Sequence, residues 1–179
     1  MTVDEYFSFT DARPDNEKWE LIDGEPILNA SPSGTHHRIL KNLIFLLAAA
    51  ERARPESWEA IPGIGVRVST TSLPEPDVMI LAAGAIHRDP YGRQTADVIA
   101  TFEILSPSTA DRDLHWKRTA YTGLPSLTHY VVIAQDVVVF ARELRFAERR
   151  LRSLRDSLEI SALGISLPLV EIYRNTGLQ

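Results

Sequence analysis

"TFEILSPSTADRDLHWKRTAY" (101–121) is the stretch of sequence that decides the fold. The stretch begins within an apolar run that extends from 97 to 105. This run predicts a central strand that is buried on both faces except at Glu103. A carboxylate at such a position loses much of its hydration, and this is costly unless another group compensates it. The rest of the chain should therefore provide a cation or a proton for Glu103.

A helix is expected directly after this strand, over about 108–122. Ser108 and Asp111 are suitable N-cap residues, and Gly123 suits the position just beyond the C-terminus. Within the helix, Asp113, Lys117 and Tyr121 are spaced by four residues and so share one face. Lys117 is therefore a candidate cation for Glu103. The alternative is a surface Asp113–Lys117 ion pair, which would contribute only about 0.3–0.5 kcal/mol.

The remaining segments alternate between helical and strand-like patterns, which favours an α/β (α+β) layer fold. Without a repeat or a Pro/Gly-rich linker, residues 1–179 are expected to form a single domain. The other expected elements are a capped helix at 3–9, a hairpin at 18–29 turning at Asp23-Gly24, a helix at 35–52, strands at 58–69, 76–82, 129–134 and 136–143, and a strand with a short helical tail at 158–173.

Composition narrows the class of protein. The chain has no cysteine, which excludes disulfides and thiolate metal sites. Its longest apolar stretch, "LIFLLAAA" (43–50), is far shorter than a membrane span, and its N-terminal residues do not resemble a secretory signal. A cytoplasmic protein without a membrane partner is expected.

Charge gives a mixed indication about nucleic acid. The net charge of −5 disfavours tight nonspecific binding, yet six arginines lie within 141–156. That cluster could contact phosphates, or it could be a solvated edge with local ion pairs, and the second interpretation is favoured.

Two acidic residues lie on neighbouring predicted strands. Asp77 opens the strand at 76–82, and Glu103 lies in the next predicted strand. If these strands pair, the two carboxylates converge at one sheet edge, where Mg²⁺ would relieve their repulsion. Protonation of one carboxylate, or an ion pair with a cation from the following helix, would be alternative compensations.

Several segments, in this order, resemble the Uma-two family of restriction-endonuclease-like proteins, part of the PD-(D/E)XK nuclease superfamily. The resemblance runs from about residue 5 to 173. Its most specific part is the long pattern that begins at Glu103 and extends to Tyr121. The matching segments are "WELIDGE" (19–25), "SPSGTHHRIL" (31–40), "PDVMIL" (76–81), "FEILSPSTADRDLHWKRTAY" (102–121) and "LEISALGISLPLVEIY" (158–173).

The resemblance implies a restriction-endonuclease-like mixed β-sheet flanked by helices, with Mg²⁺ (or Mn²⁺) at the sheet edge. Asp77 matches the PD aspartate and Glu103 the (D/E) residue, and the backbone carbonyl of Ile104 is a further expected metal ligand. The usual lysine position, two residues after the acid, holds Leu105. Family members similarly place a lysine on the next helix, where Lys117 stands.

Two more residues of the expected catalytic set come from the same resemblance. Glu20 matches the acid of the family's "YELIDGE" segment and would supply a third carboxylate, or else would be a strand-edge residue facing solvent. His36 opens the family's long helix, where it would line the site or bind a phosphate, or else would be a half-buried core histidine.

The expected function is a Mg²⁺-dependent endonuclease acting on DNA, with Lys117 orienting the attacking water. Because nucleases of this fold commonly pair to cut two strands, a homodimer is expected. The first alternative is a catalytically inactive protein of the same fold that binds DNA or a protein. A second is acid–base chemistry on a small substrate, which would require a strongly raised carboxyl pKa and no metal.

Overall fold

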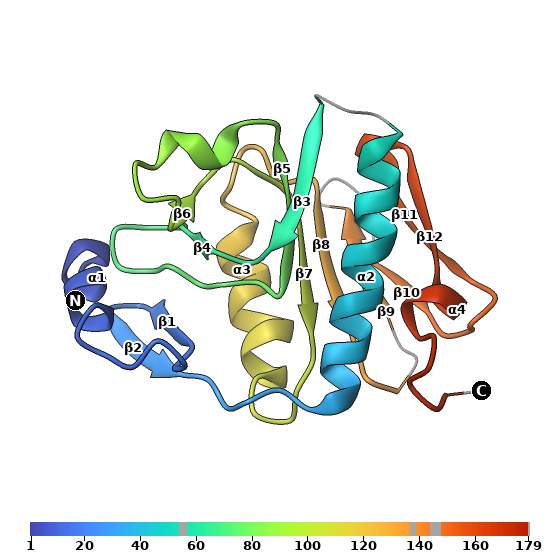
Figure 1. The fold of residues 1–179 in the computed structure, drawn as a ribbon, viewed down its shortest axis with the longest axis horizontal. Coiled ribbons are helices and arrows are strands. Elements are labelled where there is room, and N and C mark those ends of the chain that lie inside the picture. The colour runs from blue at the N-terminus through green and yellow to red at the C-terminus, as the bar shows by residue number, and fades with distance from the viewer. Residues whose placement is uncertain (54–56, 137–138, 144–147, 179) are drawn as a thin grey trace.

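The computed structural model describes residues 1–53, 57–136, 139–143 and 148–178. Figure 1 labels its main elements along the chain. The helices are α1 (Val3–Thr10), α2 (Gly34–Arg52), η1 (Ala85–Arg88), η2 (Arg112–Lys117), α3 (Arg118–Tyr121), η3 (Ser161–Leu163) and α4 (Leu169–Ile172). The strands are β1 (Trp19–Ile22), β2 (Glu25–Leu28), β3 (Trp58–Pro62), β4 (Gly65–Val66), β5 (Val78–Ala82), β6 (Gln94–Thr95), β7 (Val98–Ile104), β8 (His129–Ile133), β9 (Val139–Glu143), β10 (Arg149–Leu151), β11 (Ser157–Ile160) and β12 (Ile165–Pro168).

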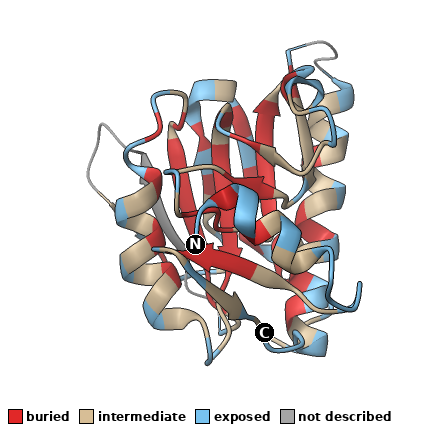
Figure 2. Ribbon diagram, turned by 90° about the vertical axis from the view of Figure 1, so that its left-hand side faces the viewer, coloured by how far each residue is buried: buried red, intermediate tan, exposed pale blue. Residues whose placement is uncertain are grey.

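A six-stranded mixed sheet in the order β10-β9-β8-β7-β5-β3 forms the centre of the fold. Within this sheet β7 and β8 pair in parallel, and the other described neighbours are antiparallel. The η2–α3 helix connects the two parallel strands, as a crossover connection requires. It covers one face of the sheet, and α2 covers the other (Figures 1 and 2). This arrangement confirms the predicted mixed sheet flanked by helices.

The two faces of the sheet bury separate hydrophobic clusters. Phe102 and Val131 pack with α2 in one cluster, whereas Met79 and Tyr130 pack with Tyr121 of α3 in the other. Because side chains alternate along a strand, Glu103 projects toward the face that η2 and α3 cover. The predicted central strand therefore directs its one acidic residue at the predicted helix.

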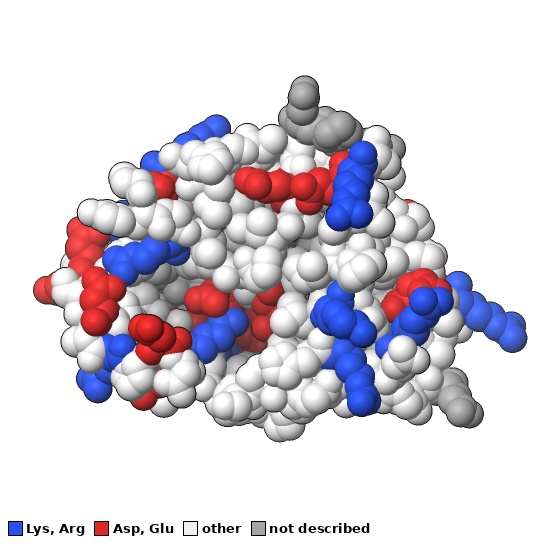
Figure 3. All heavy atoms as spheres, in the orientation of Figure 1, with Lys and Arg blue, Asp and Glu red and all other residues white. Residues whose placement is uncertain are grey.

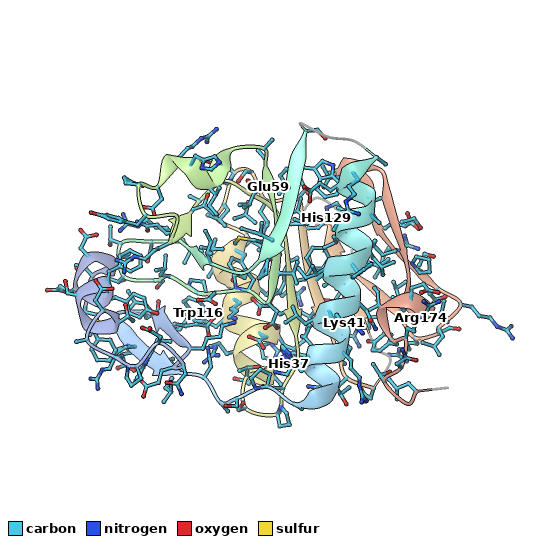
Figure 4. All side chains as sticks on the ribbon, in the orientation of Figure 1. His37, Lys41, Glu59, Trp116, His129 and Arg174 are labelled. Atoms are coloured by element: carbon cyan, nitrogen blue, oxygen red, sulfur yellow. The ribbon has the colours of Figure 1, made fainter. Side chains whose placement is uncertain are left out.

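The β1–β2 hairpin lies at one end of this layer and is anchored to it in two places. Its turn has positive φ at Asp23 (49°) and Gly24 (85°), as predicted. Leu21 forms a bridge with Leu73, and Trp116 donates from η2 to Asp23 Oδ2 at 2.7 Å. Figure 4 shows Trp116 directed toward the hairpin. These contacts bring β1 next to η2 and to the segment that leads into Asp77.

Three local predictions need correction. The expected strand at 58–69 is divided, because β3 pairs with β5 only as far as Pro62 and the chain then continues as β4, which pairs in parallel with β6. Asp111 makes no side-chain cap bond, and Gly123 does not adopt positive φ. The helix between them contains a π-helical turn, η2. By contrast, the Thr2–Glu5 capping box of α1 is confirmed.

Part of the arginine-rich segment 141–156 lies outside the described residues, at 144–147. Within the described part, Arg150 pairs with Glu148, which also contacts Arg118. In the part of the chain that the structure describes, no helix is long and apolar enough to cross a membrane.

Candidate active site

Asp77 faces the C-terminal end of β7 because β5 and β7 are antiparallel neighbours. Val78 pairs with Phe102, and the Asp77 N–H donates to the Phe102 carbonyl at 3.1 Å. The Ile104 N–H in turn donates to Asp77 Oδ2 at 2.7 Å. The strand pairing on which the two-carboxylate hypothesis depended is therefore present, and Asp77, Glu103 and Ile104 line one pocket.

Gly63 fixes the backbone around Asp77. Its N–H donates to the Asp77 carbonyl at 3.1 Å, and its Cα lies against Pro76 so closely that no side chain fits. The glycine thus permits β3 and the Pro76–Asp77 segment to approach each other closely.

The ammonium group of Lys117 contacts three carboxylates inside the protein. Only 2 % of its surface is exposed, as for Glu103. Its Nζ lies 2.8 Å from Glu20 Oε1, 3.0 Å from Glu103 Oε2 and 3.2 Å from Asp113 Oδ1. The alternative of a surface Asp113–Lys117 pair is wrong, because both residues are buried. Tyr121, on the same face of the helix, donates its hydroxyl hydrogen to Glu103 Oε1 at 3.2 Å.

Glu20 enters this network from the β1–β2 hairpin. It is 1 % exposed, so the solvent-facing alternative is wrong. Besides Lys117, it contacts Arg112 at 2.7 Å, and it accepts hydrogen bonds from Asn29 Nδ2 at 3.0 Å and the Glu75 N–H at 2.8 Å. Arg112 and Asn29 were not predicted, and neither carries a local sequence signal that could have identified it.

His36 occupies the first turn of α2, which Ser33 caps. Its Nε2 donates to Asp77 Oδ2 at 3.2 Å, while its Nδ1 is buried without a hydrogen-bond partner in the described chain. The residue is thus both largely buried and a lining residue of the pocket.

Lys18 and Glu75 lie at the open side of the site. Lys18 Nζ is 3.4 Å from Glu75 Oε1 and 3.8 Å from Asp77 Oδ1. Sequence reasoning missed both residues. Glu75 could have been found, because a residue two positions before Asp77 points to the same side of an extended chain.

The acid–lysine pocket, as we call the space lined by Asp77, Glu103 and Lys117, has a volume of about 130 Å³. That is room for roughly four waters at about 30 Å³ each. Figure 3 shows acidic and basic side chains gathered in a hollow between the β1–β2 hairpin and α2.

Burial and nearby positive charge shift the pKa values of the pocket's carboxyl groups in opposite directions. Burial raises the pKa of Asp77, but the His36 hydrogen bond and the Lys18 charge outweigh it, so the pKa is lowered. Burial also raises the pKa of Glu20, yet Lys117 and Arg112 bring it down to about 2. Both residues are therefore carboxylates at neutral pH.

Glu103 behaves differently from the other two acids. Burial raises its pKa well above the usual range, and the neighbouring carboxylates Asp113, Asp77 and Glu20 add to this, although Lys117 opposes it. Burial lowers the pKa of Lys117, but Glu103 and Glu20 more than compensate, and the pKa is raised. The pocket thus carries more negative charge than its cations neutralise.

The donor set is compatible with Mg²⁺. This ion requires only one or two carboxylates and retains several waters, for which the acid–lysine pocket has room. Within the described residues, no group of three or more acidic or histidine side chains is arranged to hold a metal. Leu105, in the usual lysine position, packs with the hydrophobic cluster around Tyr121 instead.

The π-helical turn η2 carries Arg112, Asp113 and Lys117. Such turns are uncommon and often occur at functional sites. Here the turn provides both cations that contact Glu20.

Comparison with known proteins gives the family and the fold. The model of the Uma2 family, described as "Putative restriction endonuclease", matches residues 3–169. One solved structure, described as "a putative nuclease belonging to DUF820 from Anabaena variabilis", aligns with a TM-score of 0.76 over 97% of both chains. At 15% sequence identity this likeness shows the fold. No curated protein matches the chain.

Proposed function

Because the chain belongs to the Uma2 family, we propose that it is a Mg²⁺-dependent endonuclease that hydrolyses phosphodiester bonds in DNA. One observation carries the proposal: Asp77 just before β5, Glu103 on β7 and Lys117 on η2 line one pocket. Mn²⁺ is a second metal of suitable chemistry.

Asp77 and Glu103 would hold the metal, with the Ile104 carbonyl as a further oxygen ligand. Bound there, Mg²⁺ would lower the pKa of a water molecule and neutralise charge on the phosphate. The surroundings of Glu103 support this role: burial and then the neighbouring carboxylates raise its pKa, and a bound cation would offset both effects.

Lys117 holds its positive charge beside Glu103, and it would orient a water through an N–H group that one of its three carboxylate partners releases. Glu20 and His36 act through other residues in this proposal. Glu20 holds Lys117 in place, and His36 holds the Asp77 carboxylate. Both are therefore positioning residues.

The experiment is cleavage of a labelled DNA with and without Mg²⁺ by wild-type protein and the Glu103→Gln variant. Wild type should cut only with the metal, and Glu103→Gln should be inactive while retaining its circular dichroism spectrum. Glu159→Gln, at an exposed position of β11, is the matched control and should cut like wild type. Equal cleavage by Glu103→Gln and wild type would refute these roles.

One observation favours a second candidate, a catalytically inactive protein of this fold that binds DNA or a protein. The three carboxylates around Lys117 can occupy all three of its N–H donors, leaving none for water. Calorimetric titration with Mg²⁺ or Mn²⁺ separates the candidates. A heat of metal binding that wild type shows and Asp77→Ala lacks supports the nuclease. Absence of metal binding by wild type supports the inactive protein.

A further inference from the structure

A second pocket adjoins the acid–lysine pocket, and we propose that it binds an unpaired base of the nucleic-acid substrate. This aromatic pocket lies between α1, the segment 13–19, the start of β4 and the Gly92–Arg93 turn. Its volume of about 480 Å³ falls within the roughly 300–1,000 Å³ typical of small-ligand sites. The inference rests on the proposed nuclease function, for which it names the substrate class.

Flat side chains line the aromatic pocket. Phe7 and Trp19 contribute rings, and the guanidinium of Arg13 lies 4.4 Å from the Phe9 ring centroid and 5.8 Å from that of Trp19. Arg93 stacks similarly on Phe7, at 4.0 Å. Aromatic rings and arginine planes are the groups on which proteins stack unpaired bases.

The two arginines differ in their other partners. Arg93 is also paired with Asp11 at 2.6 Å, whereas Arg13 makes no ion pair within the described residues. Arg13 is exposed, so its outer face is open to a ligand. A base could therefore stack on Arg13 without breaking an ion pair, and we assign the stacking contact to Arg13.

The charges of the lining point to a base rather than a phosphate. Three cations, Arg13, Lys18 and Arg93, are balanced by three carboxylates, Asp15, Glu17 and Glu75. A lining whose charges cancel offers a phosphate no net attraction. A neutral base, by contrast, can donate its amino hydrogens to the carboxylates while its rings stack.

The aromatic pocket lies next to the acid–lysine pocket. Lys18 and Glu75 line both, and Lys18 Nζ lies 3.8 Å from Asp77 Oδ1. A base in the aromatic pocket would therefore belong to a nucleotide close to the scissile phosphate. A base within a duplex is paired and stacked, so the substrate must offer one that is unpaired or flipped out.

The test uses a short single-stranded DNA carrying 2-aminopurine, and the same sequence as a duplex, titrated with protein in the absence of metal. Stacking in the aromatic pocket should change the fluorescence of the single strand and bind it several-fold tighter than the duplex. Arg13→Ala should weaken single-strand binding about tenfold. Arg155→Ala, which removes an exposed arginine outside both pockets, should bind like wild type.

Arg13→Lys separates stacking from simple charge attraction, because lysine retains the charge but lacks the plane. It should bind as weakly as Arg13→Ala. Full recovery by lysine, or equal affinity for single strand and duplex, would overturn the inference. Because the binding assay contains no metal, base binding can be found even where hydrolysis fails. If Arg13→Ala hydrolyses DNA with an unchanged KM, the base site is refuted and the proposed nuclease function is not.

Discussion

Lys117 Nζ lies 3.0 Å from Glu103 Oε2, although the two residues belong to different elements and both are buried. This contact shows how the protein compensates the charge of a glutamate within an apolar strand. Lys117 supplies part of the compensation, and Tyr121 adds a hydrogen bond to the other oxygen of Glu103. The raised pKa of Glu103 indicates that the compensation is incomplete.

Removing the lysine charge should destabilise the protein. Lys117→Met leaves three buried carboxylates without their shared cation, and we expect a loss of roughly 3–5 kcal/mol in the free energy of unfolding. Urea denaturation measures it. Lys41→Met is the control, because Lys41 is exposed on α2 (Figure 4) and its replacement should change stability by less than about 0.5 kcal/mol. Similar stability of the two variants would show that the buried contacts contribute little.

Glu20 should make stability depend on pH in the acid range. Its pKa is lowered from 4.5 to about 2 in the folded protein, so its contribution is complete above pH 4.5 and is lost as the pH falls toward 2. The contribution is on the order of 3 kcal/mol. The measurement is the difference in unfolding free energy between wild type and Glu20→Gln from pH 6 to 3. A difference that stays constant over this range would contradict the lowered pKa.

A substitution at Gly63 should disturb the site without touching a charged residue. Gly63→Ala places a methyl group against the Pro76 carbonyl, so the segment that carries Asp77 must move. We expect lower stability and weaker Mg²⁺ binding by calorimetry. Gly34→Ala is the matched control, since a Cβ there meets nothing within 4 Å. Unchanged metal binding in Gly63→Ala would show that the position of Asp77 does not depend on this contact.

Local sequence patterns predicted the elements that carry the site. The apolar run around Glu103 identified the central strand. The spacing of Asp113, Lys117 and Tyr121 placed them on one face of the helix, and the structure shows that this face is buried. The Asp23-Gly24 turn was equally predictable, because its positive φ restricts the residues that fit.

The contacts of the hairpin with the site could not be predicted in this way. Glu20 reaches Lys117 only because the β1–β2 hairpin packs against η2 and the segment before Asp77, through contacts such as Leu21 with Leu73. Arg112 likewise meets Glu20 through the π-helical turn, which no local pattern indicated. Such contacts depend on tertiary packing rather than on propensity.

The most direct test of the metal site is the anomalous scattering of a crystal soaked in Mn²⁺. We predict one peak in the acid–lysine pocket, within coordination distance of Asp77 and Glu103, and its absence from crystals of Asp77→Ala. No peak in that pocket, with Lys117 still bound to Glu103 at high Mn²⁺ concentration, would contradict the account.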